Sequence, residues 1–105
     1  DLQERNLISG NQNQGIRMFS SNNNLIAGNF IGTDITGLAP LPNALVAVLI
    51  RDGSQSNTIG GTVPAARNII TSNAGGVNLA WSSGTQTSFN VVQGNYFGLG
   101  VDGVT

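Results

Sequence analysis

Short bursts of apolar residues, separated by polar and glycine-rich segments, run along the whole chain. Ile, Val, Leu and Phe dominate these bursts, as in the run from Ala44 to Ile50. Apolar runs of this kind, bounded by Gly, Asn, Ser and Pro, predict short β-strands joined by turns. The abundance of Gly, Asn, Ser and Thr also gives the chain a poor helix propensity. We therefore expect an all-β fold.

One element recurs along the chain: Asn, a variable residue, Ile or Val, another variable residue, a small residue, and then Asn or Thr. Its five copies are Asn6–Asn11, Asn24–Asn29, Asn57–Thr62, Asn68–Asn73 and Asn90–Asn95. Side chains alternate between the two faces of a strand, so the third residue of each copy should point inward and stack on the others. The predicted core residues are Ile8, Ile26, Ile59, Ile70 and Val92.

The Asn that opens each copy has a structural explanation. Asn tolerates the left-handed backbone angles found at turns, and stacked Asn amides can hydrogen-bond to one another along an axis. We predict that these residues form an asparagine ladder at the corners of the fold and do not bind a ligand. They are Asn6, Asn24, Asn57, Asn68 and Asn90.

The spacing of the elements indicates a coil. Asn24, Asn57 and Asn90 lie 33 positions apart. A second, strand-like pattern recurs at about the same distance, in Gly15–Met18, Ala47–Ile50 and Gly76–Leu79. The connections alternate between two kinds, because the segment after Asn24 returns only after Asn90, 66 positions later. We expect about three coils, each with one strand of either type, stacked about 4.8 Å apart.

These repeats resemble the right-handed parallel β-helix repeats of large bacterial secreted and surface proteins. The resemblance rests on the frames Arg67–Asn73, Asn24–Gly37 and Asn57–Thr62 and spans nearly the whole chain. It implies a right-handed parallel β-helix of the pectate-lyase-like superfamily, a single segment over residues 1–105, and a place outside the cell or on its surface. The wider superfamily also holds pectate lyases, polygalacturonases, phage tailspikes and adhesins, so the fold alone implies no reaction.

Charged residues are scarce, which narrows the choice of partners. The chain has four Arg, no Lys and no His against five acidic residues, with a net charge of −1. The Arg residues form no cluster, so we expect neither nucleic acid nor an anionic membrane surface as a partner. No apolar run reaches the ~20 residues of a membrane span. Without cysteine, neither disulfides nor thiolate metal sites are expected. The chain opens on Asp1 rather than Met, which suggests a processed product or an excised fragment.

Catalysis on polysaccharides would need clustered acids. Hydrolysis needs two carboxylates flanking one bond, and lyase chemistry needs calcium held by several carboxylates together with a base. Asp34, Asp52 and Asp102 are isolated in the sequence, and the repeats place Asp34 and Asp102 on one loop type, roughly 10 Å apart. The simpler interpretation is that both form Asx turns before Gly. We expect no enzyme, no cofactor and no metal.

Carbohydrate binding is the alternative function, as a glycan-binding or polysaccharide-degrading module. Trp81 and Tyr96 would stack on sugar rings, Asp34 and Asp102 would supply acidic groups, and the polar insertion Ser82–Ser88 would lie nearby. The competing interpretation is that Trp81 covers a corner of the core and that Tyr96 replaces Phe30 in the stack.

A structural function is favoured by the ends of the predicted coil. About three coils expose strand edges at both ends, and neither end of the sequence predicts a capping helix. Copies of the chain, or neighbouring repeats of a longer chain, would stack on these ends. We therefore expect a non-catalytic β-solenoid that serves as a spacer, a matrix component or a self-assembling filament.

Overall fold

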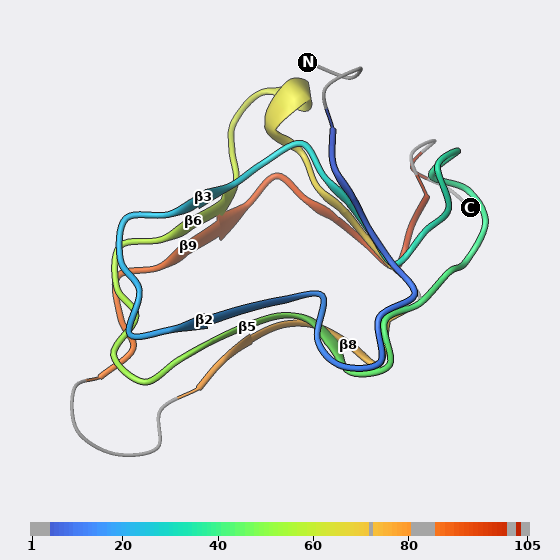
Figure 1. Ribbon diagram of the computed structural model, residues 1–105. Helices are drawn as coiled ribbons and strands as arrows, with labels where there is room; N and C mark the ends of the chain where they lie inside the picture. Colours follow the sequence, from blue (N-terminus) through green and yellow to red (C-terminus); the bar gives the residue numbers. More distant parts are fainter. Residues whose placement is uncertain (1–4, 72, 81–85, 101–102, 104–105) are drawn as a thin grey trace.

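The computed structural model describes residues 5–71, 73–80, 86–100 and 103. Within these residues the fold is all-β, with ten strands, one short 3₁₀ helix (η1, Pro64–Ala66) and no α-helix (Figure 1). The first sheet contains β1 (Leu7–Ile8), β4 (Phe30–Ile31), β7 (Ile69–Ile70) and β10 (Tyr96–Phe97). The second contains β2 (Ile16–Phe19), β5 (Val46–Arg51) and β8 (Gly75–Leu79). The third contains β3 (Leu25–Ile26), β6 (Thr58–Gly60) and β9 (Val91–Gln93).

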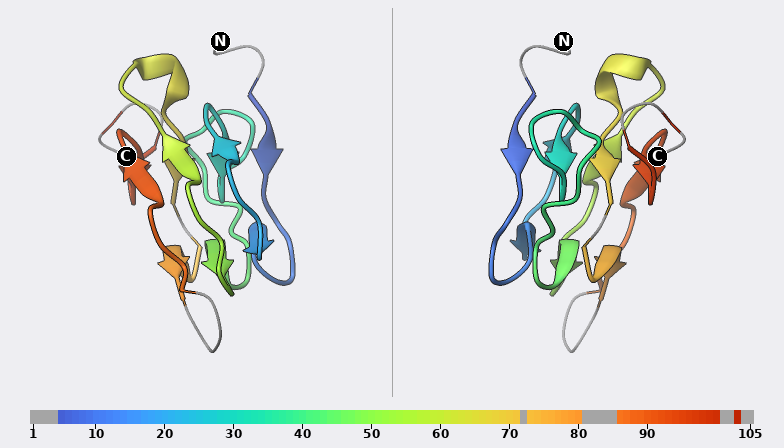
Figure 2. Two further views of the ribbon diagram at one scale, coloured as in Figure 1. Left: turned by 90° about the vertical axis from the view of Figure 1, so that its left-hand side faces the viewer. Right: turned by 90° about the vertical axis from the view of Figure 1, so that its right-hand side faces the viewer.

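The chain visits the three sheets in a fixed order, and we call one passage through all three a circuit. The order first, second, third repeats three times, and β10 then returns to the first sheet. Every pair of neighbouring strands is parallel, and successive circuits lie side by side (Figure 2). The registers Ile26↔Ile59 and Ile59↔Val92 have the period that the sequence predicted.

Each circuit has three strands, whereas the sequence predicted two. The segments Phe30–Ile31 and Tyr96–Phe97, which the sequence pattern assigned to connections, pair with Ile69–Ile70 as β4 and β10. Two-residue strands carry too little periodicity to be recognised without their partners. The five Asn-led segments divide accordingly: those at Ile8 and Ile70 lie in the first sheet and the other three in the third.

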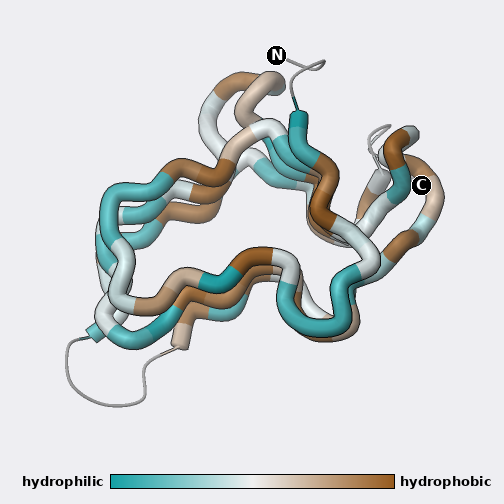
Figure 3. The backbone as a smooth tube through the Cα atoms, in the orientation of Figure 1, coloured by the Kyte–Doolittle hydropathy of each residue, from teal (hydrophilic) through white to brown (hydrophobic). Residues whose placement is uncertain are grey.

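The core lies where the inward side chains of the three sheets meet. Its buried residues are Met18, Ile26, Ile31, Ala47, Val48, Ile50, Ile59 and Ile70, with Ile8, Ile16, Val77 and Val92 packed partly buried against them. The predicted core residues therefore all contribute, but not as one stack. Ile8 and Ile70 share a column with Ile31, while Ile26, Ile59 and Val92 form another. Figure 3 shows apolar residues along the strands and polar residues at the corners between sheets.

Candidate functional site

Asparagine side chains form three columns along the corners of the fold. The first column contains Asn6, Asn29, Asn68 and Asn95, the second Asn11, Asn43 and Asn73, and the third Asn24, Asn57 and Asn90. In each column the amide Nδ2 of one Asn donates to the Oδ1 of the Asn in the next circuit. The donor–acceptor distances are 2.8–3.1 Å.

Asn57 shows how such an amide is accommodated in the interior. Its Oδ1 accepts from the backbone N–H (2.9 Å) and the Nδ2 (3.0 Å) of Asn24. Its Nδ2 donates to the carbonyl of Ser21 and to the Oδ1 of Asn90, both at 2.9 Å. The residue is fully buried, and burial of an amide is tolerated when its donors and acceptors are bonded. Both lone pairs and both N–H groups of this amide are in use.

Two other central members of the columns, Asn43 and Asn68, are bonded in the same way. Asn43 donates to the carbonyl of Ile8 at 3.1 Å and to Asn73, while Asn68 donates to the carbonyl of Ile26 at 2.9 Å and to Asn95. Each central Asn therefore ties its own circuit to the one before and the one after. The saturated amides of Asn43, Asn57 and Asn68 have no hydrogen-bonding group left for a ligand.

The structure divides the predicted ladder among these columns. Asn6 and Asn68 belong to the first column and Asn24, Asn57 and Asn90 to the third. Asn43 also belongs to the second column, although it lies in no copy of the recurring element. Its spacing was the available signal: Asn43 lies 32 positions after Asn11 and 30 before Asn73.

Left-handed backbone angles recur beside the third column. Asn23, Ser56 and Phe89, which each precede an Asn of that column, have φ values of 60°, 60° and 57°. Asn is favoured in this region and a bulky aromatic residue is not. Phe89 is also 80% exposed, so neither its backbone nor its environment favours an aromatic side chain.

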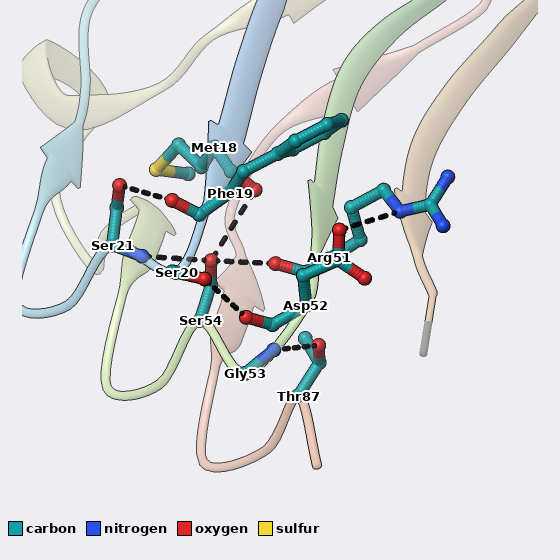
Figure 4. Close-up of polar contacts among 9 residues, drawn as sticks. All are labelled: Met18, Phe19, Ser20, Ser21, Arg51, Asp52, Gly53, Ser54 and Thr87. Carbon is teal, nitrogen blue, oxygen red and sulfur yellow. Dashed lines mark hydrogen bonds and ion pairs between the residues drawn. The ribbon is translucent and has the colours of Figure 1, made fainter. Parts of the chain in front are cut away.

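The corner between the second and third sheets is held by short hydroxyl side chains (Figure 4). The Oγ of the buried Ser54 lies 3.2 Å from the carbonyl of Met18 and 2.9 Å from that of Arg51, which share its single proton, and it accepts from the backbone N–H of Ser21 at 3.1 Å. Ser20 donates to the carbonyl of Asp52 at 2.7 Å. These bonds join successive circuits and satisfy carbonyls where the strands end.

Asp34 organises the loop that follows β4. Its Oδ1 accepts from the backbone N–H of Thr36 at 3.0 Å and of Ala39 at 3.5 Å, and also from the Thr36 hydroxyl. This is an Asx-type turn before Gly37. The hydrogen bond from the Thr36 side chain is the main cause that lowers the pKa of the Asp34 carboxyl below its ordinary value. The carboxylate thus holds its own loop.

Tyr96 takes the position that Phe30 occupies two circuits earlier. Both residues are aligned with Ile69 in the first sheet. The guanidinium of Arg67 lies 4.1 Å from the centre of the Tyr96 ring, and that of Arg5 lies 4.5 Å from the centre of the Phe30 ring. The Nε of Arg67 also donates to the carbonyl of Gly94 at 3.2 Å. One face of the Tyr96 ring is therefore occupied by a cation.

The remaining predicted glycan-site residues, Trp81 and Asp102, lie outside the described residues. Across the described ranges, no group of three or more His, Cys, Asp or Glu side chains is arranged to hold a metal ion. No helix in the described part of the chain is long and apolar enough to cross a membrane. Of the four predicted site residues, the two that are described, Asp34 and Tyr96, both make intramolecular contacts.

Comparison with protein-family models, with curated proteins and with solved structures gives no match to this chain. Function is therefore inferred from the sheets and the asparagine columns.

Proposed function

We propose that the chain is a segment of right-handed parallel β-helix with a non-catalytic, structural function. The observation that carries this proposal is the set of three asparagine columns, which continue from circuit to circuit through side-chain hydrogen bonds. Parallel strands joined by crossovers are right-handed in about 98% of known cases, which supports that hand here. Stacked repeats of this kind give a body whose length grows with the number of circuits.

The proposed setting is a secreted or cell-surface protein, in which the segment is a spacer, a matrix component or a filament subunit. The Asn- and Gly-rich frames that resemble bacterial surface repeats support this setting. The scarcity of charge also supports it, since a net charge of −1 gives little repulsion between stacked bodies. Partners would be copies of the chain, or neighbouring repeats, that stack on the ends.

Carbohydrate binding is less well supported by the described residues. A sugar ring would need an uncovered aromatic face, and one face of Tyr96 is occupied by Arg67. A catalytic pair would need two carboxylates free to act, and Asp34 is engaged by its own loop. These contacts favour the structural function over the glycan-binding one.

Electron microscopy of the purified chain, with light scattering over a range of concentrations, tests the filament function. We expect fibres whose subunit repeat is close to the height of three circuits, about 14 Å. A monodisperse monomer at every concentration would contradict self-stacking. In that case glycan arrays, with Trp81→Ala as the control variant, would test the alternative.

A further inference from the structure

Among the described residues, β8, β9 and β10 form the last layer of the stack, and we call the outer apolar surface of these three strands the C-terminal end face. Leu79 is aligned with Ile50, and Phe97 with Ile70. Ile50 and Ile70 are 0% and 2% exposed, whereas Leu79 is 49% and Phe97 45% exposed. A hollow of about 160 Å³ lies beside Phe97 and is partly lined by Gly75 and Gly76. None of the residues in these three strands is charged.

The asparagine columns also give this face a chemical direction. Asn57 donates to a carbonyl of the preceding circuit and to Asn90 of the following one. Asn90 donates to the carbonyl of Ser54, and no described Asn continues the third column beyond it. At the opposite end, the Oδ1 of Asn24 accepts no hydrogen bond from the described residues. In the third column, one end face therefore presents an amide donor and the other an amide acceptor.

A second copy of this chain fits these requirements. Its first circuit would present Asn11 and Asn24, which are placed relative to one another as Asn43 and Asn57 are inside the chain. Asn90 of the first copy would then donate to Asn24 of the second through the N–H group that the Ser54 carbonyl does not use. In the same movement, β2 and β3 of the second copy would pair with β8 and β9.

The strand count creates one conflict in this joint. The first sheet has four strands, while the second and third have three. A copy that places β2 on β8 and β3 on β9 brings its own β1 to the place held by β10. The strand β10 is a weak occupant, since it has two residues and pairs only with β7 among the described strands.

We propose that the C-terminal end face binds the first circuit of a second copy, and that β1 of the incoming copy replaces β10. This inference rests on the proposed structural function. In the joint, Asn68 donates to Asn6 of the second copy as it now donates to Asn95, and Ile8 takes the inward position of Phe97. Because β10 has to leave, it limits association of the intact chain.

Release of β10 tests the replacement. The backbone N–H of Tyr96 donates to the carbonyl of Asn68 at 3.0 Å, and proline has no N–H to donate. We expect Tyr96→Pro to lower the concentration of half-association at least about tenfold, which corresponds to about 1.4 kcal/mol. Sedimentation velocity measures the association. A Tyr96→Pro variant with a native circular-dichroism spectrum and unchanged association would overturn the proposal.

A charge in the joint tests the docking surface. In the Tyr96→Pro background, Leu79→Lys places an ammonium group on the end face. Ile35→Lys is the matched control, because Ile35 is 73% exposed on the loop after β4 and belongs to none of the strands β8, β9 and β10. We expect Leu79→Lys to abolish association and Ile35→Lys to leave it unchanged. Equal behaviour of the two variants would refute docking through this face.

The outcome separates this inference from the proposed function. Association between copies tests only the end face. The repeating fold is tested separately, by inserting whole circuits into a single chain, which involves no contact between copies. If the copies fail to dock and the added circuits fold, the end-face proposal is wrong and the β-helix stands.

Discussion

The middle and last circuits are built from the same sequence pattern, yet they differ in burial. Val48, Ile50 and Ile59 lie between strands on both sides and are fully buried. Their counterparts Val77 and Val92 in the last circuit are only partly buried, although they point into the same interior.

The difference shows that burial in this fold comes from the neighbouring circuits. A strand of two to six residues cannot bury a side chain by itself, so each circuit depends on the one above and the one below. Stability in such stacks is approximately a sum of terms for each repeat and for each contact between neighbours. Equivalent substitutions should therefore cost more in the middle than at the ends.

The largest effect is expected where a column is cut in the middle. Asn57→Ala removes four hydrogen bonds of a buried amide and leaves its partners unpaired, so we expect a loss of about 4 kcal/mol in the free energy of unfolding. Asn24→Ala, at the end of the same column, should cost about 1 kcal/mol. Urea unfolding measures both. Equal losses at the two positions would show that the columns do not couple the circuits.

Glycine substitutions provide a second comparison between the interior and the edge. A Cβ at Gly60, where φ is +98°, would lie within 2 Å of the Gln93 carbonyl oxygen in the next circuit. At Gly98, where φ is +75°, a Cβ meets none of the described residues within 4 Å. We expect Gly60→Ala to cost at least about 3 kcal/mol and Gly98→Ala about 1 kcal/mol. Thermal unfolding measures both variants. If their stabilities do not differ by more than the experimental error, the close packing of circuits is contradicted.

Phe89 is a position where substitution should stabilise the chain. Its φ of +57° is unfavourable for an aromatic residue, and the equivalent position in the first circuit is Asn23. We expect Phe89→Asn to raise the free energy of unfolding by about 1 kcal/mol. Phe89→Ala is the control, since alanine keeps the backbone penalty and should bring no comparable gain. A gain of the same size for both variants would assign the effect to the exposed ring instead.

The smallest effect is expected in the loop held by Asp34. The pKa of this carboxyl is lower in the folded chain than its ordinary value. Its contribution is therefore fully present above the ordinary carboxyl pKa and is lost as the pH falls through the lowered one. Hydrogen exchange at the Thr36 and Ala39 amides should speed up on acidification, relative to the intrinsic rate, while the sheets stay protected. Asp34→Asn should remove this pH dependence, and an unchanged profile in that variant would assign it elsewhere.

The sequence predicted the repeating part of this fold well, because repetition is visible without coordinates. The all-β class, the 33-residue period of Asn24, Asn57 and Asn90 and the inward Ile and Val residues all follow from local pattern. The sequence was less informative about the sheet to which each element belongs. Identical Asn-led motifs lie in two different sheets, and the motif itself does not encode the corner at which it sits.

The candidate site could also be predicted only in part, where the contacts of a residue are made by its neighbours in the sequence. The turn-forming role of Asp34 follows from the residues beside it. The cation above Tyr96 comes from Arg67, on another circuit, so a sequence pattern could not reveal it. Asn43 was missed because it lies in no copy of the recurring element, although its spacing from Asn11 and Asn73 was an available signal.

The central claim is that circuits stack as equivalent units, and lengthening the chain by whole circuits tests it most directly. A second copy of residues 24–89, inserted after residue 89, adds two 33-residue intervals. Small-angle X-ray scattering should then show a particle about 10 Å longer. A copy of residues 24–45 is the control, since it adds strands of the third and first sheets but none of the second. An expanded, partly unfolded particle with the 24–89 insertion, like that expected of the control, would contradict the account.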